Sequence, residues 1–172
     1  TGAHAGLGFD TARALAARGA SVVLLCRDAA RGTAAARAIA AETGNARVVA
    51  EALDVSSLAD VRRVAVRLAR EPIDVLVHNA GVLPAVRIET AEGFELTHAT
   101  HVVGPHLLTK LLRSALAAGR ARVVWVSSGG MYARRFRLDD PAWRARPYDW
   151  VAAYAETKRA QVVLAELWAD VL

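Results

Sequence analysis

Short apolar runs alternate with helical stretches along the chain, and this order restricts the possible folds more than any other feature. Four strands are predicted, at residues 20–26, 46–53, 74–78 and 122–127, and the continuous apolar run at 20–26 is typical of a strand buried on both faces. Helices are predicted at about residues 9–18, 28–42, 57–70, from 94 or 99 to 118, and from 150 to 172. The alternation predicts an α/β fold, a Rossmann-like, doubly wound parallel sheet in three α/β/α layers.

Length and composition exclude several classes of protein. The 172 residues are enough for one domain, and Cys26, the only cysteine, fits a reducing compartment such as the cytoplasm. The net charge of +5 comes from arginines scattered along alanine-rich helical stretches, so nucleic-acid binding is not expected. No apolar run approaches the roughly 18 residues that cross a bilayer. No metal-binding residues are predicted.

A glycine-rich turn opens the chain, with the pattern Thr1-Gly2-x-x-x-Gly6-Leu7-Gly8. Glycines allow a tight turn and let a ligand approach the backbone without a Cβ in the way. The helix that begins near Leu7 presents free N–H groups and the positive end of its dipole to a phosphate. A plain strand-to-helix connection is the alternative interpretation. Such a turn normally follows a strand, and none precedes it here, so we expect a fragment without its first, central strand.

The residues after the first predicted strand indicate which dinucleotide is bound. In dinucleotide-binding folds an acid at this point binds a ribose 2′-hydroxyl, whereas an arginine accommodates a 2′-phosphate. Cys26 stands where the acid is expected, and Arg27 offers a permanent charge suited to phosphate. We therefore expect NADP(H) in preference to NAD(H). Asp28 is interpreted as the N-cap of the next helix.

Small and polar residues follow the other three predicted strands, at the edge where ligands bind in open parallel sheets. These segments are Asp54-Val55, Asn79-Ala80-Gly81 and Ser127-Ser128. Asp54 could accept a hydrogen bond from an adenine amine, and the small residues leave room for a cofactor ribose. A serine at the end of the last strand can hold a substrate oxygen, with a polar turn as the alternative.

Tyr154 and Lys158 lie four residues apart in the last predicted helix, which places them one turn apart on the same face. An unperturbed phenol has a pKa near 10, and a fixed cation within about 4–6 Å favours its ionised form. The pair therefore fits a proton donor and acceptor with a tuning cation. An aromatic core residue beside a solvated amine is the alternative.

Five segments in this order resemble the short-chain dehydrogenase/reductase family, in its non-extended branch. They are Thr1-Gly2-x-x-x-Gly6-x-Gly8, Asp54-Val55, Asn79-Ala80-Gly81, Ser127-Ser128 and Tyr154-x-x-x-Lys158. A narrower resemblance, to the subgroup called dehydrogenase/reductase family member 12, rests on residues 126–131 and 154–164. The resemblance implies one NAD(P)-binding Rossmann-fold domain over residues 1–172. Family members continue past the last helix, so it also implies a fragment truncated at both ends and inactive by itself.

The resemblance implies roles for individual residues. Tyr154 would exchange a proton with the substrate oxygen, Lys158 would tune it and bind the nicotinamide ribose, and Ser128 would orient that oxygen. In the family an asparagine of the long middle helix completes a proton relay, and His101 occupies its position here. We hypothesise that His101 takes over the relay, with a packed structural histidine as the alternative.

The expected function is that of an NADP(H)-dependent oxidoreductase acting on a small-molecule carbonyl or alcohol. The alternative is a cofactor-binding module that senses or scaffolds without turnover. Family members often pair through the two long helices, here about residues 99–118 and 151–172. Their apolar faces would permit a homodimer or homotetramer.

Overall fold

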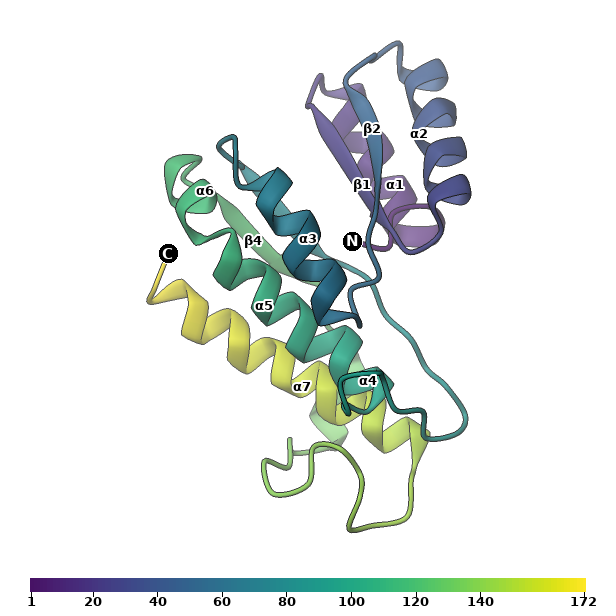
Figure 1. Ribbon diagram of the computed structural model, residues 1–172, viewed down its shortest axis with the longest axis vertical. Coiled ribbons are helices and arrows are strands. Elements are labelled where there is room, and N and C mark those ends of the chain that lie inside the picture. The colour runs from purple at the N-terminus through teal and green to yellow at the C-terminus, as the bar shows by residue number, and fades with distance from the viewer. The chain divides into compact units, whose positions relative to one another are not determined.

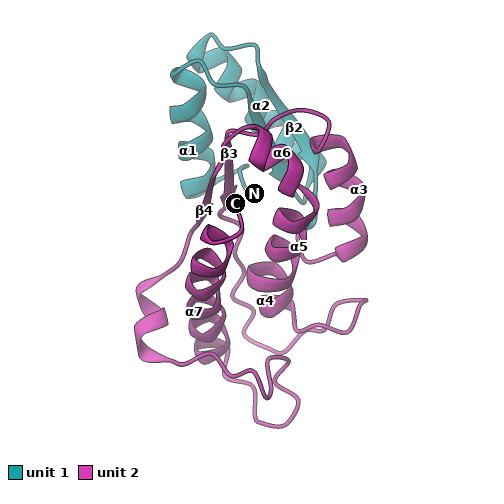
Figure 2. Ribbon diagram, turned by 90° about the vertical axis from the view of Figure 1, so that its left-hand side faces the viewer, with its two compact units in different colours: residues 1–54 teal, residues 55–172 magenta.

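The computed structural model describes residues 1–172 and divides into two compact units, residues 1–54 and 55–172 (Figure 2). The predicted alternation of helices and parallel strands is confirmed (Figure 1). The four strands form two parallel pairs, one in each unit. None of the helices combines the length and the apolar character that crossing a membrane requires.

The first unit packs two helices on a pair of strands. Its elements are α1 (Gly6–Ala17), β1 (Val22–Cys26), α2 (Ala29–Thr43) and β2 (Val48–Ala52). The parallel register runs from Val22 opposite Val48 to Cys26 opposite Ala52. Alanines of both helices form one core with Leu24, Ile39 and Val48, because small side chains let the helices approach the strands closely.

The second unit carries the other strand pair and the longer helices. Its elements are α3 (Leu58–Leu68), β3 (Val75–His78), α4 (Leu96–His98), α5 (Gly104–Leu111), α6 (Arg113–Ala118), β4 (Arg122–Trp125) and α7 (Trp150–Ala169). The parallel register runs from Val75 opposite Arg122 to His78 opposite Trp125. Helix α5 lies between α3 and α7 (Figure 1). A Cβ on Gly104 would overlap the carbonyl oxygen of Val55, so only glycine permits this approach.

The middle helix is not one continuous α-helix, which corrects the prediction of a single element ending at residue 118. A π-helical turn, Ala99–Val103, joins α4 to α5, and the backbone leaves the helix again at Leu112 before α6. Pro105 explains the turn, because it has no N–H to donate to the carbonyl of His101 and its ring crowds that carbonyl. The N–H of Gly104 instead bonds to the carbonyl of Ala99, five residues back.

Candidate active site

The glycine-rich turn leaves the start of α1 open. Gly2 and Gly6 have left-handed φ angles of 65° and 55°, which favour glycine. The N–H of Gly2 donates to the carbonyl of Leu25 at 2.8 Å, which fixes the turn on β1. Ala5 precedes the helix and supplies no side-chain cap, and Leu7 is exposed. The first N–H groups of this 12-residue helix therefore fit an anionic ligand such as a phosphate.

The last residue of β1, Cys26, and the two residues after it have different environments. The Cys26 side chain is buried, and this burial raises the pKa of its thiol. The Asp28 carboxylate accepts the N–H of Arg31 at 3.0 Å, which confirms that it caps α2. Arg27 is exposed between them. The guanidinium is thus the side chain at this strand end that suits a phosphate. Asp54 follows β2 at the end of the first unit.

Tyr154 and Lys158 share one face of α7 in the second unit. The Lys158 ammonium lies 5.5 Å from the centre of the Tyr154 ring and donates to the carbonyl of Val126 at 2.8 Å. The Lys158 side chain is buried, and this burial lowers its pKa to about 8. The carbonyl of Val126 therefore holds the Lys158 ammonium beside the Tyr154 ring. No protein group hydrogen-bonds the Tyr154 hydroxyl, which leaves it available to a ligand.

The two serines after β4 take different positions. The Ser127 hydroxyl donates to the carbonyl of Lys158 at 2.8 Å and so fastens the end of the strand to α7. Ser128 precedes a short 3₁₀ turn, Gly129–Ala133, and its oxygen lies 3.4 Å from the N–H of Gly130. The Ser128 side chain is half-buried, and this weak bond leaves its hydroxyl able to bind another oxygen.

His101 lies in the π-helical turn with both ring nitrogens in hydrogen bonds. Nε2 lies 3.0 Å from the N–H of Val82, and Nδ1 lies 2.8 Å from the hydroxyl of Thr157. The ring meets Tyr154 edge to face, with centres 5.4 Å apart and planes at 85°. Burial, and then the nearby Lys158 and His98, lower the pKa of His101 to about 3. The imidazole is therefore neutral at physiological pH.

Gly81 brings the segment after β3 against this cluster. A Cβ on Gly81 would lie 3.2 Å from Nε2 of His101 and 3.9 Å from the Lys158 ammonium. A Cβ there would be tight against the imidazole and in ordinary contact with the ammonium. Asn79 and Ala80 precede it in the same segment, directly after β3. The second unit therefore brings together four predicted residues: Gly81, His101, Tyr154 and Lys158.

The residues predicted to bind the phosphates and the 2′-phosphate all lie in the first unit, whereas those predicted for the chemistry lie in the second. Thr157 and Val82 were not expected from the sequence. Thr157 falls at an unspecified position of the Tyr-x-x-x-Lys pattern, and Val82 contributes only its backbone. The spacing of a motif reports neither contact.

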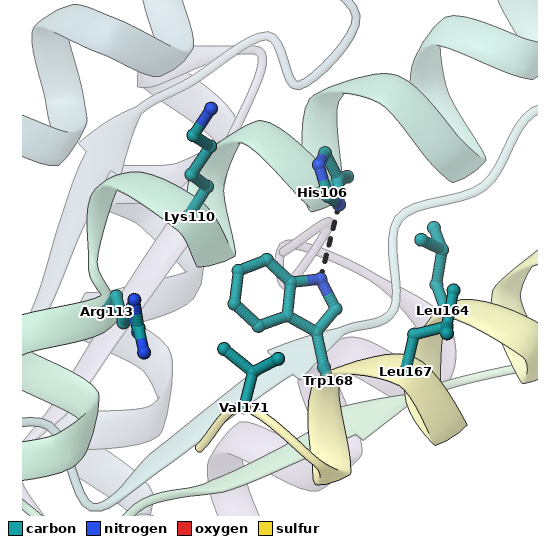
Figure 3. Close-up of a pocket in the computed structure, with 7 residues that line it drawn as sticks. All are labelled: His106, Lys110, Arg113, Leu164, Leu167, Trp168 and Val171. Carbon is teal, nitrogen blue, oxygen red and sulfur yellow. Dashed lines mark hydrogen bonds between the residues drawn. The ribbon is translucent and has the colours of Figure 1, made fainter.

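A separate pocket of about 360 Å³ opens between α5, α6 and α7 (Figure 3). Trp168 lines it, and its indole N–H donates to Nδ1 of His106 at 3.2 Å. Lys110 and Arg113 lie at its edge, and the remaining lining residues are Leu164, Leu167 and Val171. None of the predicted catalytic residues lines this pocket, so we assign it no part in the proposed chemistry.

Comparison with known families decides the identity of the fold. A family model described as enoyl-(acyl carrier protein) reductase matches residues 2–135. The chain belongs to the short-chain dehydrogenase/reductase family. This confirms the resemblance inferred from the five segments, and it places the chain in a family of oxidoreductases. The matched range ends at residue 135, so it does not include Tyr154 and Lys158.

Curated relatives of this short-chain dehydrogenase/reductase chain are considerably longer. It is 44% identical to human dehydrogenase/reductase SDR family member 13 over 100% of its own length and 46% of that protein. It is 39% identical to mouse retinol dehydrogenase 13, over 95% and 50%. Bovine dehydrogenase/reductase SDR family member 12, of the predicted subgroup, is 37% identical over 98% and 54%. The chain spans about half the length of these relatives.

Solved structures show the same fold. A crystal structure of an uncharacterized protein from Mycobacterium paratuberculosis has a TM-score of 0.85 and 38% identity, over 99% of this chain and 60% of that one. A short-chain dehydrogenase from Sphingobium yanoikuyae in complex with NADPH has a TM-score of 0.76 and 26% identity, over 99% and 63%. These neighbours confirm the Rossmann-like α/β class.

Proposed function

We propose that the protein is an NADP(H)-dependent oxidoreductase that transfers hydride between nicotinamide and a carbonyl or alcohol. The observation that supports it most is the state of the pair on α7. No protein group hydrogen-bonds the Tyr154 hydroxyl, while the Lys158 ammonium is buried beside the ring and donates to the carbonyl of Val126. Burial disfavours the charged form of Lys158, so its position costs stability. Such a buried charge beside a hydroxyl without a hydrogen bond is typical of a functional site.

The proposed chemistry uses three side chains. A bound nicotinamide cofactor would supply or accept the hydride. Tyr154 donates its hydroxyl proton to the carbonyl oxygen during reduction and takes it back during oxidation. Lys158 stabilises the phenolate that remains, because its charge lies on the same helix face. Ser128 donates a hydrogen bond to the substrate oxygen and so orients it.

The residues of the first unit fit such a cofactor. The uncapped start of α1 offers backbone N–H groups to a pyrophosphate, and the glycines before it keep side chains away. Arg27 is exposed next to Cys26, which stands where an acid would otherwise bind the 2′-hydroxyl, and Asp28 is already engaged as a helix cap. This arrangement supports NADP(H) in preference to NAD(H). The NADPH complex of the Sphingobium neighbour supports the same cofactor class.

The test is consumption of NADPH by the intact protein with a panel of carbonyl substrates, followed by nicotinamide fluorescence. Tyr154→Phe should lower the rate about a hundredfold or more while NADPH binding persists, since general acid–base catalysis contributes on this scale. Tyr132→Phe is the matched control, because that ring is 81% exposed and lies outside the cluster. Unchanged turnover in Tyr154→Phe would contradict the proposed role.

One observation favours the second candidate, a cofactor-binding module without turnover. His101 stands where the family places its relay asparagine, and both of its ring nitrogens are occupied by protein groups. A protein that binds NADPH tightly and consumes none across carbonyls and alcohols in both directions would support the module.

A further inference from the structure

We infer that His101 is a neutral positioning residue that joins the segment after β3 to the Tyr154 turn of α7 through a one-way chain of hydrogen bonds. The inference rests on the proposed function, because the groups that it positions are the proposed site. It differs from the proton relay expected from the sequence. A relay needs a ring that exchanges its proton with solvent or substrate, whereas a positioning residue needs a ring that keeps one tautomer.

The partners of His101 determine which nitrogen carries the proton. The backbone N–H of Val82 can only donate, so Nε2 must accept through its lone pair. A neutral ring then has its proton on Nδ1, which donates to the hydroxyl oxygen of Thr157. The Thr157 hydroxyl in turn donates to the carbonyl of Tyr154 at 2.8 Å. Each proton in the chain points the same way, from Val82 to Tyr154.

A second proton on the ring would break this chain. It would place an N–H of His101 against the N–H of Val82, at a distance of 3.0 Å between the nitrogens. It would also put a second positive charge near Lys158, and near His98 when that imidazole is protonated. The ring is completely buried, so water cannot replace the lost partner.

The ring also sets distances inside the proposed site. It contacts the Tyr154 ring, and a Cβ added to Gly81 would lie 3.2 Å from Nε2 of His101, so the ring lies against both the phenol and the segment after β3. The π-helical turn aims the imidazole at this point, and such turns are frequent at functional sites. Displacement of the ring would therefore move the phenol relative to the segment predicted to leave room for a cofactor ribose, and small misplacements cost large factors in rate.

Thr157 permits a test that leaves the imidazole in place. In the intact protein, Thr157→Val removes the acceptor of the Nδ1 proton with little change in volume, whereas Thr157→Ser keeps the hydroxyl. We expect Thr157→Val to lower kcat about tenfold or more, with a smaller change in KM and no shift of the pH profile. Thr157→Ser should restore most of kcat. A Val variant with unchanged kcat would overturn the inference.

A readout that does not depend on activity separates this inference from the proposed function. The ¹⁵N shifts of the His101 ring report its tautomer, and we expect the Nδ1–H form from pH 7 down to pH 5. An Nε2–H tautomer, or a ring that titrates in this range, would overturn the inference and support the relay. If Tyr154→Phe retains activity while the tautomer is as expected, the proposed function fails and the hydrogen-bond chain stands.

Discussion

Neighbouring residues at the end of β1 have separate roles, and Arg27 offers a direct test of cofactor preference. Arg27→Ala in the intact protein should weaken NADPH binding about tenfold and leave NADH binding nearly unchanged, because only NADPH carries the 2′-phosphate that a guanidinium pairs with. Fluorescence titration with both cofactors measures the two dissociation constants. Arg37→Ala is the control, since that side chain is also exposed but lies on α2. Equal weakening for both cofactors would contradict the assignment.

The sequence pattern predicted the functional side chains of the candidate site, but not the residues that hydrogen-bond to them. Tyr154 and Lys158 could be paired from the sequence because helical periodicity alone places them on one face. The carbonyl of Val126 that holds Lys158 lies 32 positions away, and Thr157 lies 56 positions from His101. Such contacts depend on how strands and helices pack, so spacing within a motif cannot predict them.

Helix packing in the second unit depends on one glycine. Gly104→Ala should destabilise the protein by about 3 kcal/mol or more, because the added Cβ overlaps the carbonyl oxygen of Val55 and the backbone must move. Urea unfolding followed by circular dichroism measures the loss. Gly129→Ala is the matched control, because a Cβ there meets no atom within 4 Å. If both variants unfold at the same urea concentration, the close approach of the two segments is not required.

The segment before α7 is fastened to that helix by a buried ion pair. The Arg146 guanidinium binds both carboxylate oxygens of Glu156, at 2.8 and 2.6 Å, and stacks on the Trp143 ring at 3.5 Å. Glu156 lies between Tyr154 and Lys158 in sequence. The pair therefore ties the stretch after β4 to the helix that carries the proposed catalytic groups.

Removal of one partner tests how much this pair contributes. Arg146→Met should lower the free energy of unfolding by about 3 kcal/mol, because the Glu156 side chain is only 5% exposed and its charge is left unpaired. Arg13→Met should cost clearly less than Arg146→Met, because its pair with Glu42 is exposed to solvent. Chemical denaturation of the intact protein measures both. Similar losses of unfolding free energy in the two variants would show that burial does not determine how much an ion pair contributes to stability.

Element order was predictable because apolar periodicity follows from burial, and the strands and helices lie within a few residues of their expected positions. The interruption of the middle helix was missed although Pro105 signals it. An interior proline removes the hydrogen bond to the residue four positions back, which is His101. The register between strands was not predictable, since it is set by the packing of helices that are distant in sequence.

Across the whole molecule, buried histidines make the folded state bind fewer protons than the unfolded chain. His78 is buried with Nε2 2.8 Å from the hydroxyl of Thr109, and its pKa is lowered to about 3 by burial. His101 has a pKa of about 3 for the same main reason. In the unfolded chain a histidine takes up its proton near pH 6.5. Stability must therefore fall as the pH decreases from about 6.5 towards 3.

This loss of stability is large enough to measure between pH 7 and pH 5, at pH values above those at which carboxylates titrate. Between pH 7 and pH 5 each of the two histidines should cost about 2 kcal/mol, because the unfolded state gains protons that the folded state refuses. Urea unfolding at pH 7, 6 and 5 measures the pH dependence, and His78→Asn and His101→Gln should each reduce the loss between pH 7 and pH 5 by about 2 kcal/mol, in spite of lower stability at pH 7. Stability that is constant or rising towards pH 5 would mean that both rings accept protons in the folded protein. That result would also remove the basis for a neutral His101 beside Tyr154, since the same burial keeps both imidazoles uncharged.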